Sequence, residues 1–152
     1  MVTSKKSWAA IVMTAASWEH FSHGADMGVR GVGPSREEAF EQAAMALCAL
    51  TTDLDAVQAR EKVDVHCEAP DHEVLFVDWL NAIVFEMACR HMVFSRFRVM
   101  VEGHRLSGSA WGERVDPQKH PPGVEVKGAT FTELAVRQDE DGTWIAQCVV
   151  DV

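Results

Sequence analysis

The stretch Asp71-His-Glu-Val-Leu-Phe-Val-Asp-Trp-Leu-Asn-Ala-Ile-Val-Phe-Glu-Met-Ala-Cys-Arg-His91 decides the fold class of this protein. Its apolar residues cover almost every side of a helix and leave only a narrow polar strip around Asp78, Asn81 and Glu86. A helix that is apolar on nearly all sides lies at the centre of a domain, where a sheet and other neighbours cover it. Asp78 and Glu86 interrupt the apolar run, which argues against a helix that spans a membrane.

A second helix precedes this one and carries a clear start signal. Ser35 is followed three residues later by Glu38, which is the pattern of a capping box, and residues 51–53 should end the helix. Between these ends, apolar residues recur at helical spacing and form one stripe: Phe40, Ala43, Ala44, Leu47 and Leu50. The sequence therefore predicts a helix with one face against the core.

Most of the remaining segments alternate apolar and polar residues with the period of two that is typical of strands. They are residues 27–32, 63–67, 93–101, 106–111, 124–130, 132–137 and 143–150. The strands at 93–101 and 106–111 are separated by a turn at Gly103-His104 and should form a hairpin. This order of elements predicts an α+β fold, a single two-layer domain in which a mixed β-sheet packs against two α-helices.

Residues 1–16 precede this pattern and are interpreted as a flexible N-terminal extension, which leaves residues 17–152 as the domain. Lys5 and Lys6 stand before a short apolar run and loosely imitate a signal peptide. The run is interrupted by Thr14 and is far shorter than the about 20 apolar residues that a membrane helix requires. We therefore expect no membrane association and a cytoplasmic location.

Charge and cysteine content narrow the class of function. The 152 residues include 14 Lys and Arg against 23 Asp and Glu, which gives a formal net charge of −9. Such a surface repels phosphate backbones, so RNA would reach the protein only indirectly, through another molecule. The 4 cysteines show no CxxC spacing and lie in or beside apolar stretches, which predicts reduced thiols packed as small hydrophobic groups.

The sequence contains none of the common catalytic motifs. Its 7 histidines show neither HxH nor HExxH spacing, which argues against a zinc hydrolase. There is no P-loop, no GxGxxG after a strand and no GxSxG elbow. The sequence therefore favours a binding or accessory protein over an enzyme.

Two acidic residues are candidates for a metal site. Asp26 follows two small residues, Gly24 and Ala25, in a predicted tight turn just before a strand, and Asp151 ends an apolar strand beside Val152. Two carboxylates with the terminal oxygen of Val152 would suit a hard cation such as Ca²⁺, Mg²⁺ or Mn²⁺. Spacing alone does not bring the two acids together, so a turn cap and a solvated chain end remain the simpler interpretation.

A proline-containing loop near the end of the chain carries further polar residues, among them Glu113, Asp116 and His120. Glu125 and Lys127 share one face of the strand predicted after it. They could form a surface ion pair worth less than about 1 kcal/mol, or Lys127 could bind a phosphate or an acidic partner. From the sequence alone, the ion pair is the simpler interpretation.

Taken together, several segments resemble the archease family. The stretch Trp18-Glu-His-Phe-Ser-His-Gly-Ala-Asp-Met-Gly-Val-Arg-Gly31 is similar to the signature of that family, an aromatic stretch followed by His-Thr-Ala-Asp-Ile/Val-Gly. Further similar blocks follow in order at residues 37–44, 79–81, 94–97, 110–113, 116, 120, 125–127, 130 and 149–152. The chain departs from the family pattern at Gly24, Gly128 and Phe131, where Thr, Ala and an aromatic hydroxyl are usual.

The resemblance implies an accessory protein that activates an RtcB-type RNA-splicing ligase. Such a protein promotes GTP-dependent guanylylation of the ligase's active-site histidine and so permits multiple turnover in tRNA splicing and RNA repair. Asp26, Asp151 and Val152 match the metal ligands of the family, with Ca²⁺ as the expected ion and Mg²⁺ or Mn²⁺ as alternatives. Lys127 matches a lysine thought to matter for activation, and we expect Glu113 and His120 to contribute to partner activation as well.

Two other classes of function stay open. Archeases have also been linked to the solubility of an RNA methyltransferase and resemble a chaperone domain in fold. A general protein chaperone or modulator is therefore the alternative. A metal-dependent hydrolase built on Asp26 and Asp151 is a third hypothesis, and the lack of a candidate general base other than His23 counts against it.

Overall fold

The structure of the protein is a computed structural model that describes residues 15–152. Residues 1–14 of the extension that was expected at residues 1–16 lie outside the described residues. Within residues 15–152, neither of the long helices combines the length and the hydropathy needed to cross a membrane.

Two α-helices form the middle of the molecule, α2 (Arg36–Thr51) and α3 (His72–Arg90). The predicted start of α2 is confirmed, because Ser35 Oγ accepts a hydrogen bond of 3.1 Å from the N–H of Glu38. Asp71 caps the start of α3 in the same way, through the N–H of the third helical residue. The local signals in the sequence therefore place both helices correctly.

The strands of residues 15–152 form two sheets in which every pairing is antiparallel. One sheet has the order β3-β5-β4; the other has the order β1-β2-β8-β6, with β7 also paired to β8. The bounds are β1 (Ser17–His23), β2 (Asp26–Gly33), β3 (Glu61–Glu68), β4 (Met92–Glu102), β5 (Arg105–Arg114), β6 (Gly128–Ala129), β7 (Ala135–Gln138) and β8 (Trp144–Asp151). A short 3₁₀ helix, η1 (Leu54–Ala56), follows α2.

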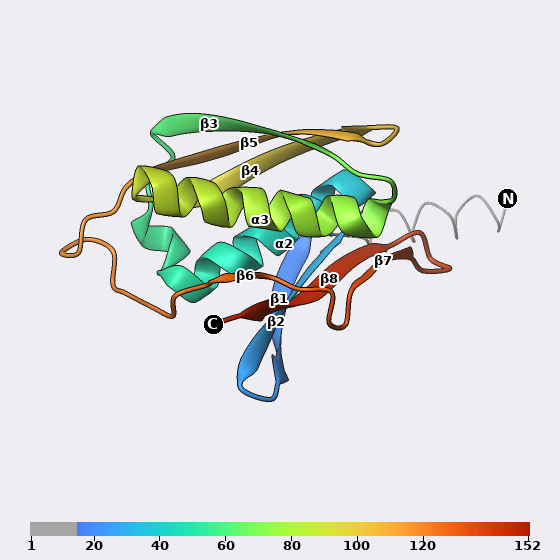
Figure 1. Ribbon diagram of the computed structural model, residues 1–152, viewed down its shortest axis with the longest axis horizontal. Coiled ribbons are helices and arrows are strands. Elements are labelled where there is room, and N and C mark those ends of the chain that lie inside the picture. The colour runs from blue at the N-terminus through green and yellow to red at the C-terminus, as the bar shows by residue number, and fades with distance from the viewer. Residues whose placement is uncertain (1–14) are drawn as a thin grey trace, which may run out of the picture.

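The two sheets lie on opposite sides of the helices, as Figure 1 shows. Helix α2 contacts β2 and β8 on one side and β4 on the other, while α3 contacts the three-stranded sheet as well as β6 and β7. The predicted α+β class with two helices is confirmed, but two antiparallel sheets replace the single mixed sheet. The reason is that short connections such as β1–β2 and β4–β5 turn the chain back on itself, and an all-round apolar helix needs cover on two sides.

The strand prediction for residues 124–130 needs correction, because only Gly128–Ala129 forms a strand there. The N–H groups of Gly123 and Val124 donate to the carbonyls of Thr51 and Leu50 at the C-terminal end of α2. This segment therefore uses backbone hydrogen bonds to cap a helix that would otherwise end with free carbonyls. Strand β1, which precedes the predicted turn at Asp26, was not among the predicted strands.

The cysteine prediction is partly confirmed. Cys48 and Cys148 are buried, and burial raises the pKa of each thiol to about 12. Cys89 is exposed instead, because it lies on the solvent side of the last turn of α3. All four cysteines lie in the described part of the chain and none forms a disulfide.

Trp79 joins both helices to the three-stranded sheet. Its side chain is fully buried on α3, and its Nε1–H donates to the carbonyl of Phe40 on α2 at 3.0 Å. The edge of its indole meets the ring of Phe97 on β4, with centroids 6.0 Å apart. On the opposite side, α2 approaches β2 so closely that a Cβ on Gly31 would lie 1.9 Å from the carbonyl oxygen of Ala39.

Replacing Gly31 by Ala should therefore destabilise the protein, because the added methyl group overlaps backbone atoms of α2 that cannot move aside. We expect a loss of about 1–3 kcal/mol or more in the free energy of unfolding, measured by urea denaturation. Gly128→Ala is the matched control, since its Cβ would meet only the end of the Asn81 side chain, at 3.3 Å. Equal losses in the two variants would contradict the argument.

Candidate functional site

The pairing of β2 with β8 brings the two candidate metal-binding acids together. Met27 pairs with Val150, so the next position along the two strands sets Asp26 opposite Asp151. Cross-strand neighbours carry their side chains on the same face of a sheet. The N–H of Val152 lies 3.4 Å from Asp26 Oδ1. Asp26, Asp151 and Val152 are called the acid cluster below.

The electrostatics of the acid cluster fit a hard cation. Neither Asp26 nor Asp151 forms an ion pair with another described residue. Like charges directly opposite each other in a sheet are destabilising, and a cation between them would relieve that repulsion. Residues 15–152 contain no group of three His, Cys, Asp or Glu residues suited to a metal ion, so the fit depends on an oxygen of Val152 as a further donor.

Lys127 lies beside the acid cluster. Its N–H donates to the carbonyl of Asp151 at 2.8 Å, and Gly128 pairs with Asp151 across the sheet. Its side chain is exposed, whereas the side chain of Val126 is buried. Lys127 forms no ion pair with any residue in 15–152, so the pair with Glu125 that the sequence left open is not formed. Its ammonium group is free to contact a partner.

Glu113 and His120 form a separate cluster at the end of β5. Donors from three directions converge on the Glu113 carboxylate: Gln58 N at 2.8 Å, Lys119 Nζ at 2.8 Å and His120 Nε2 at 3.0 Å. The backbone N–H of Gln58, followed by the Lys119 ammonium group, lowers the pKa of Glu113 from 4.5 to about 2. Glu113 is therefore a buried, ionised anchor for the loop that follows β5.

Hydrogen bonds also determine which nitrogen of His120 carries the proton. The backbone N–H of Asp116 donates to His120 Nδ1 at 2.9 Å, so Nδ1 is the acceptor and Nε2–H donates to Glu113. Only 1% of the His120 side-chain surface is exposed. The Glu113 side chain is 12% exposed, and both residues already bond to each other, so we expect any effect on partner activation to act mainly through the loop they hold.

Asn81 is a residue of this region whose role sequence reasoning missed. Its Oδ1 accepts a hydrogen bond of 2.8 Å from the N–H of Ala129, which ties α3 to β6 next to Lys127. A signal was available, because Asn81 is one of the few polar residues on an otherwise apolar helix. An amide suits this position, because Asn81 is exposed on α3 and its oxygen can accept from the N–H of Ala129.

Replacing Glu113 by Gln should weaken the protein in a pH-dependent way. The pKa is lowered on folding, so the carboxylate stabilises the fold above its ordinary value of 4.5, and this contribution is lost as the pH falls towards 2. At about pH 7 we expect the variant to lose about 1–3 kcal/mol in the free energy of unfolding, since its donors lose a charged acceptor.

Urea denaturation at about pH 7 and about pH 3 checks this expectation, because the gap between wild type and variant should shrink at the lower pH. Glu140→Gln, in an exposed turn, controls for the removal of one negative charge. Its free energy of unfolding should match that of wild type at both pH values. If the difference in the free energy of unfolding between wild type and variant stayed constant with pH, the Glu113 carboxylate would not be the source of the lost stability.

Several known proteins resemble this chain over most of its length, and they belong to one family. Residues 18–152 match the Archease protein family. "Protein archease" of Pyrococcus abyssi is 38% identical over 139 residues, which cover 89% of this chain and 98% of that protein. "Protein archease" of Methanopyrus kandleri is 40% identical over 139 residues, with 89% and 99% coverage.

Solved structures agree with the sequence matches. The solution structure of Methanobacterium thermoautotrophicum protein 1598 aligns with a TM-score of 0.79 at 33% identity, over 90% of this chain and 99% of that one. A crystal structure of an archease from Thermotoga maritima, described as a "possible chaperone", aligns with a TM-score of 0.59 at 21% identity, over 88% and 96%. This second likeness concerns the fold alone. The chain therefore belongs to the archease protein family.

Proposed function

We propose that this protein is an accessory factor that activates an RtcB-type RNA-splicing ligase by promoting GTP-dependent guanylylation of the ligase's active-site histidine. Membership of the archease family supports an accessory role over an enzymatic one. The observation that carries the proposal is that the acid cluster and Lys127, all singled out by the resemblance of the sequence, lie together at one end of the five-stranded sheet.

Each residue of the site has a part in this proposal. Asp26, Asp151 and an oxygen of Val152 hold a divalent cation. Oxygen donors suit Ca²⁺, Mg²⁺ and Mn²⁺ alike, and Ca²⁺ is the ion that the family resemblance favours. The cation supplies the positive charge that the paired carboxylates lack and holds Val152 against β2. The Lys127 ammonium group, exposed beside this site, contacts an acidic patch or a nucleotide phosphate on the ligase. RNA stays with the ligase, because a net charge of −9 repels it.

The other two functions considered from the sequence give different outcomes. A hydrolase has one point in its favour, since His23 pairs with Asp26 across the β1–β2 hairpin. Turnover of phosphomonoesters or cyclic phosphodiesters that requires both residues would replace our proposal. A general chaperone would slow the aggregation of an unrelated protein, and the Lys127 side chain would be dispensable for that effect.

Removing either acid should abolish binding of the cation. In Asp26→Asn and Asp151→Asn we expect calorimetry with Ca²⁺ to show affinity at least about tenfold weaker, a loss of about 1.4 kcal/mol or more. Ca²⁺ should raise the melting temperature of wild type, and we expect this rise to vanish in both variants. Glu140→Gln removes one exposed acid elsewhere and should bind like wild type. Binding that is unchanged in both Asp variants would exclude the acid cluster as the site.

Replacing Lys127 by Ala should separate activation from structure. An exposed side chain without an ion pair contributes little to stability, so the melting temperature and the Ca²⁺ affinity should stay close to wild type. Formation of the ligase–GMP adduct and multiple-turnover ligation should both fall by about tenfold or more, as expected when one charged contact of roughly 1.5–3 kcal/mol is lost.

Lys62→Ala is the matched control, because it removes one exposed cation from β3, in the other sheet. It should activate the ligase as wild type does. Full activation by Lys127→Ala would move the contact with the ligase to another surface. A large fall in its melting temperature would instead assign Lys127 a structural role.

A further inference from the structure

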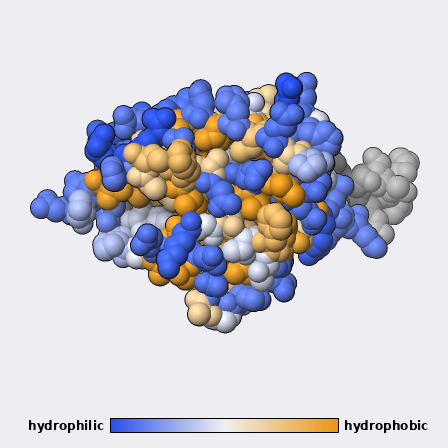
Figure 2. Space-filling view, in the orientation of Figure 1, coloured by the Kyte–Doolittle hydropathy of each residue, from blue (hydrophilic) through white to orange (hydrophobic). Residues whose placement is uncertain are grey.

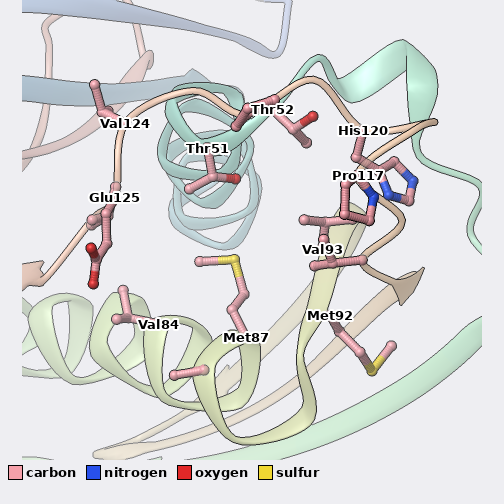
Figure 3. A pocket seen from close by; sticks show the side chains of 14 residues that line it. Thr51, Thr52, Val84, Met87, Met92, Val93, Pro117, His120, Val124 and Glu125 are labelled. Carbon is pink, nitrogen blue, oxygen red and sulfur yellow. The ribbon is translucent and has the colours of Figure 1, made fainter.

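A pocket of about 380 Å³ lies between the ends of both helices, the start of β4 and the loop that follows β5 (Figure 3). Its walls are mainly apolar side chains, with Val84 and Met87 on α3, Met92 and Val93 on β4, and Val124 and Val126 on the loop. Pockets of roughly 300–1,000 Å³ are large enough to bury a ligand. No residue of the acid cluster lines this pocket.

Most polar side chains in the pocket wall already form hydrogen bonds within the protein, and one charged side chain is left for an occupant to contact. Thr51 Oγ1 donates to the carbonyl of Cys48, and Thr52 Oγ1 donates to the carbonyl of Pro121. His120 uses both ring nitrogens within its own cluster. Glu125 differs, because its exposed carboxylate lines the pocket and forms no ion pair with another described residue. In Figure 3 it is directed towards α3.

The electrostatics at the pocket favour a positive charge. The last turn of α2 and the last turn of α3 both contribute to the lining, and helix C-termini carry partial negative charge. Helix α2 has no basic residue in its last turn, and Arg90 at the end of α3 is already paired with Glu86. Backbone N–H groups already cap carbonyls at both helix ends, so the Glu125 carboxylate is the main charge that makes the pocket complementary to a cation attached to an apolar group.

Apolar surface continues beyond the mouth of the pocket. Val115 and Val124 are 43% and 45% exposed at its rim, and Phe85 on α3, next to Val84, is 62% exposed. Figure 2 shows hydrophobic side chains reaching the surface over α3 between hydrophilic ones. Surface of this kind favours a chain segment over a small molecule. Met87 and Met92 are flexible enough to adapt their shape to it.

We propose that this pocket is the docking site for a peptide segment of a protein partner, one with a large aliphatic side chain next to a Lys or Arg. The aliphatic side chain fills the pocket, and its basic neighbour contacts the Glu125 carboxylate. The wall formed by Val124 and Val126 leads directly to Lys127, so a docked partner lies beside the acid cluster. The proposal goes beyond ligase activation, since it requires neither a metal ion nor a particular enzyme.

Methyl NMR of the full chain labelled at the methionine methyl groups tests the proposal with two peptides. The first is acetyl-Gly-Leu-Lys-Leu-Gly-amide, and the second has Glu in place of Lys. The Lys peptide should shift the signals of Met87 and Met92 saturably and leave Met100, which is 62% exposed on β4 outside the pocket, unchanged. The Glu peptide should bind at least about tenfold more weakly, because the charge contact changes sign.

Variants of exposed residues separate the pocket from other surfaces. Ala88→Phe should fill the pocket and abolish the shifts, whereas Cys89→Phe, the adjacent exposed residue outside the lining, should keep them. Glu125→Gln should reduce the preference for the Lys peptide without loss of apolar binding. Because Ala88 and Glu125 are exposed, both variants should keep the melting temperature of wild type.

Several results would overturn the proposal. They are shifts that persist in Ala88→Phe, equal shifts from both peptides, and no shift from either. A dimer in sedimentation that Ala88→Phe dissociates would assign the pocket to a second copy of this chain. Failure of ligase activation would leave the peptide result unchanged, so the two proposals can fail separately.

Discussion

The antiparallel pairing of β2 with β8 is the contact on which the rest of this structure depends. It joins residues near the two ends of the described chain, and the hydrogen bond from Val152 to Asp26 spans 126 positions. Closing so long a loop carries an entropic cost, which packing offsets: Val29 and Val150 are buried, and Gly31 lets α2 approach the backbone of β2. The acid cluster exists only while this pairing holds.

The loop between β5 and β6 is held at both ends and in the middle. Glu113 and His120 anchor its start, Gly123 and Val124 cap α2, and the N–H of Lys127 bonds to the carbonyl of Asp151. The buried pair at its start and the exposed lysine at its end are thus parts of one segment. A loop held in this way forms a steady wall for the neighbouring pocket and a defined position for Lys127.

Charge is distributed unevenly over the two candidate surfaces. The acid cluster gathers carboxylates that nothing in residues 15–152 neutralises, while Lys127 stands unpaired beside it on a chain of net charge −9. The pocket adds an unpaired Glu125 and two helix C-termini. Exposed unpaired charges cost an isolated domain little, because water solvates them, and they leave these surfaces able to attract a cation and a protein partner of complementary charge.

The sequence by itself determined the elements that depend on near neighbours. The cap at Ser35, the extent and apolar character of α3 and the α+β class follow from local spacing, and the resemblance singled out Asp26, Asp151 and Lys127. Only the tertiary structure decided that the strands form two antiparallel sheets and that Asp26 lies opposite Asp151. It also showed that Lys127 is unpaired and that Glu113 is buried among donors. These features depend on contacts between residues far apart in the chain, which local periodicity does not encode.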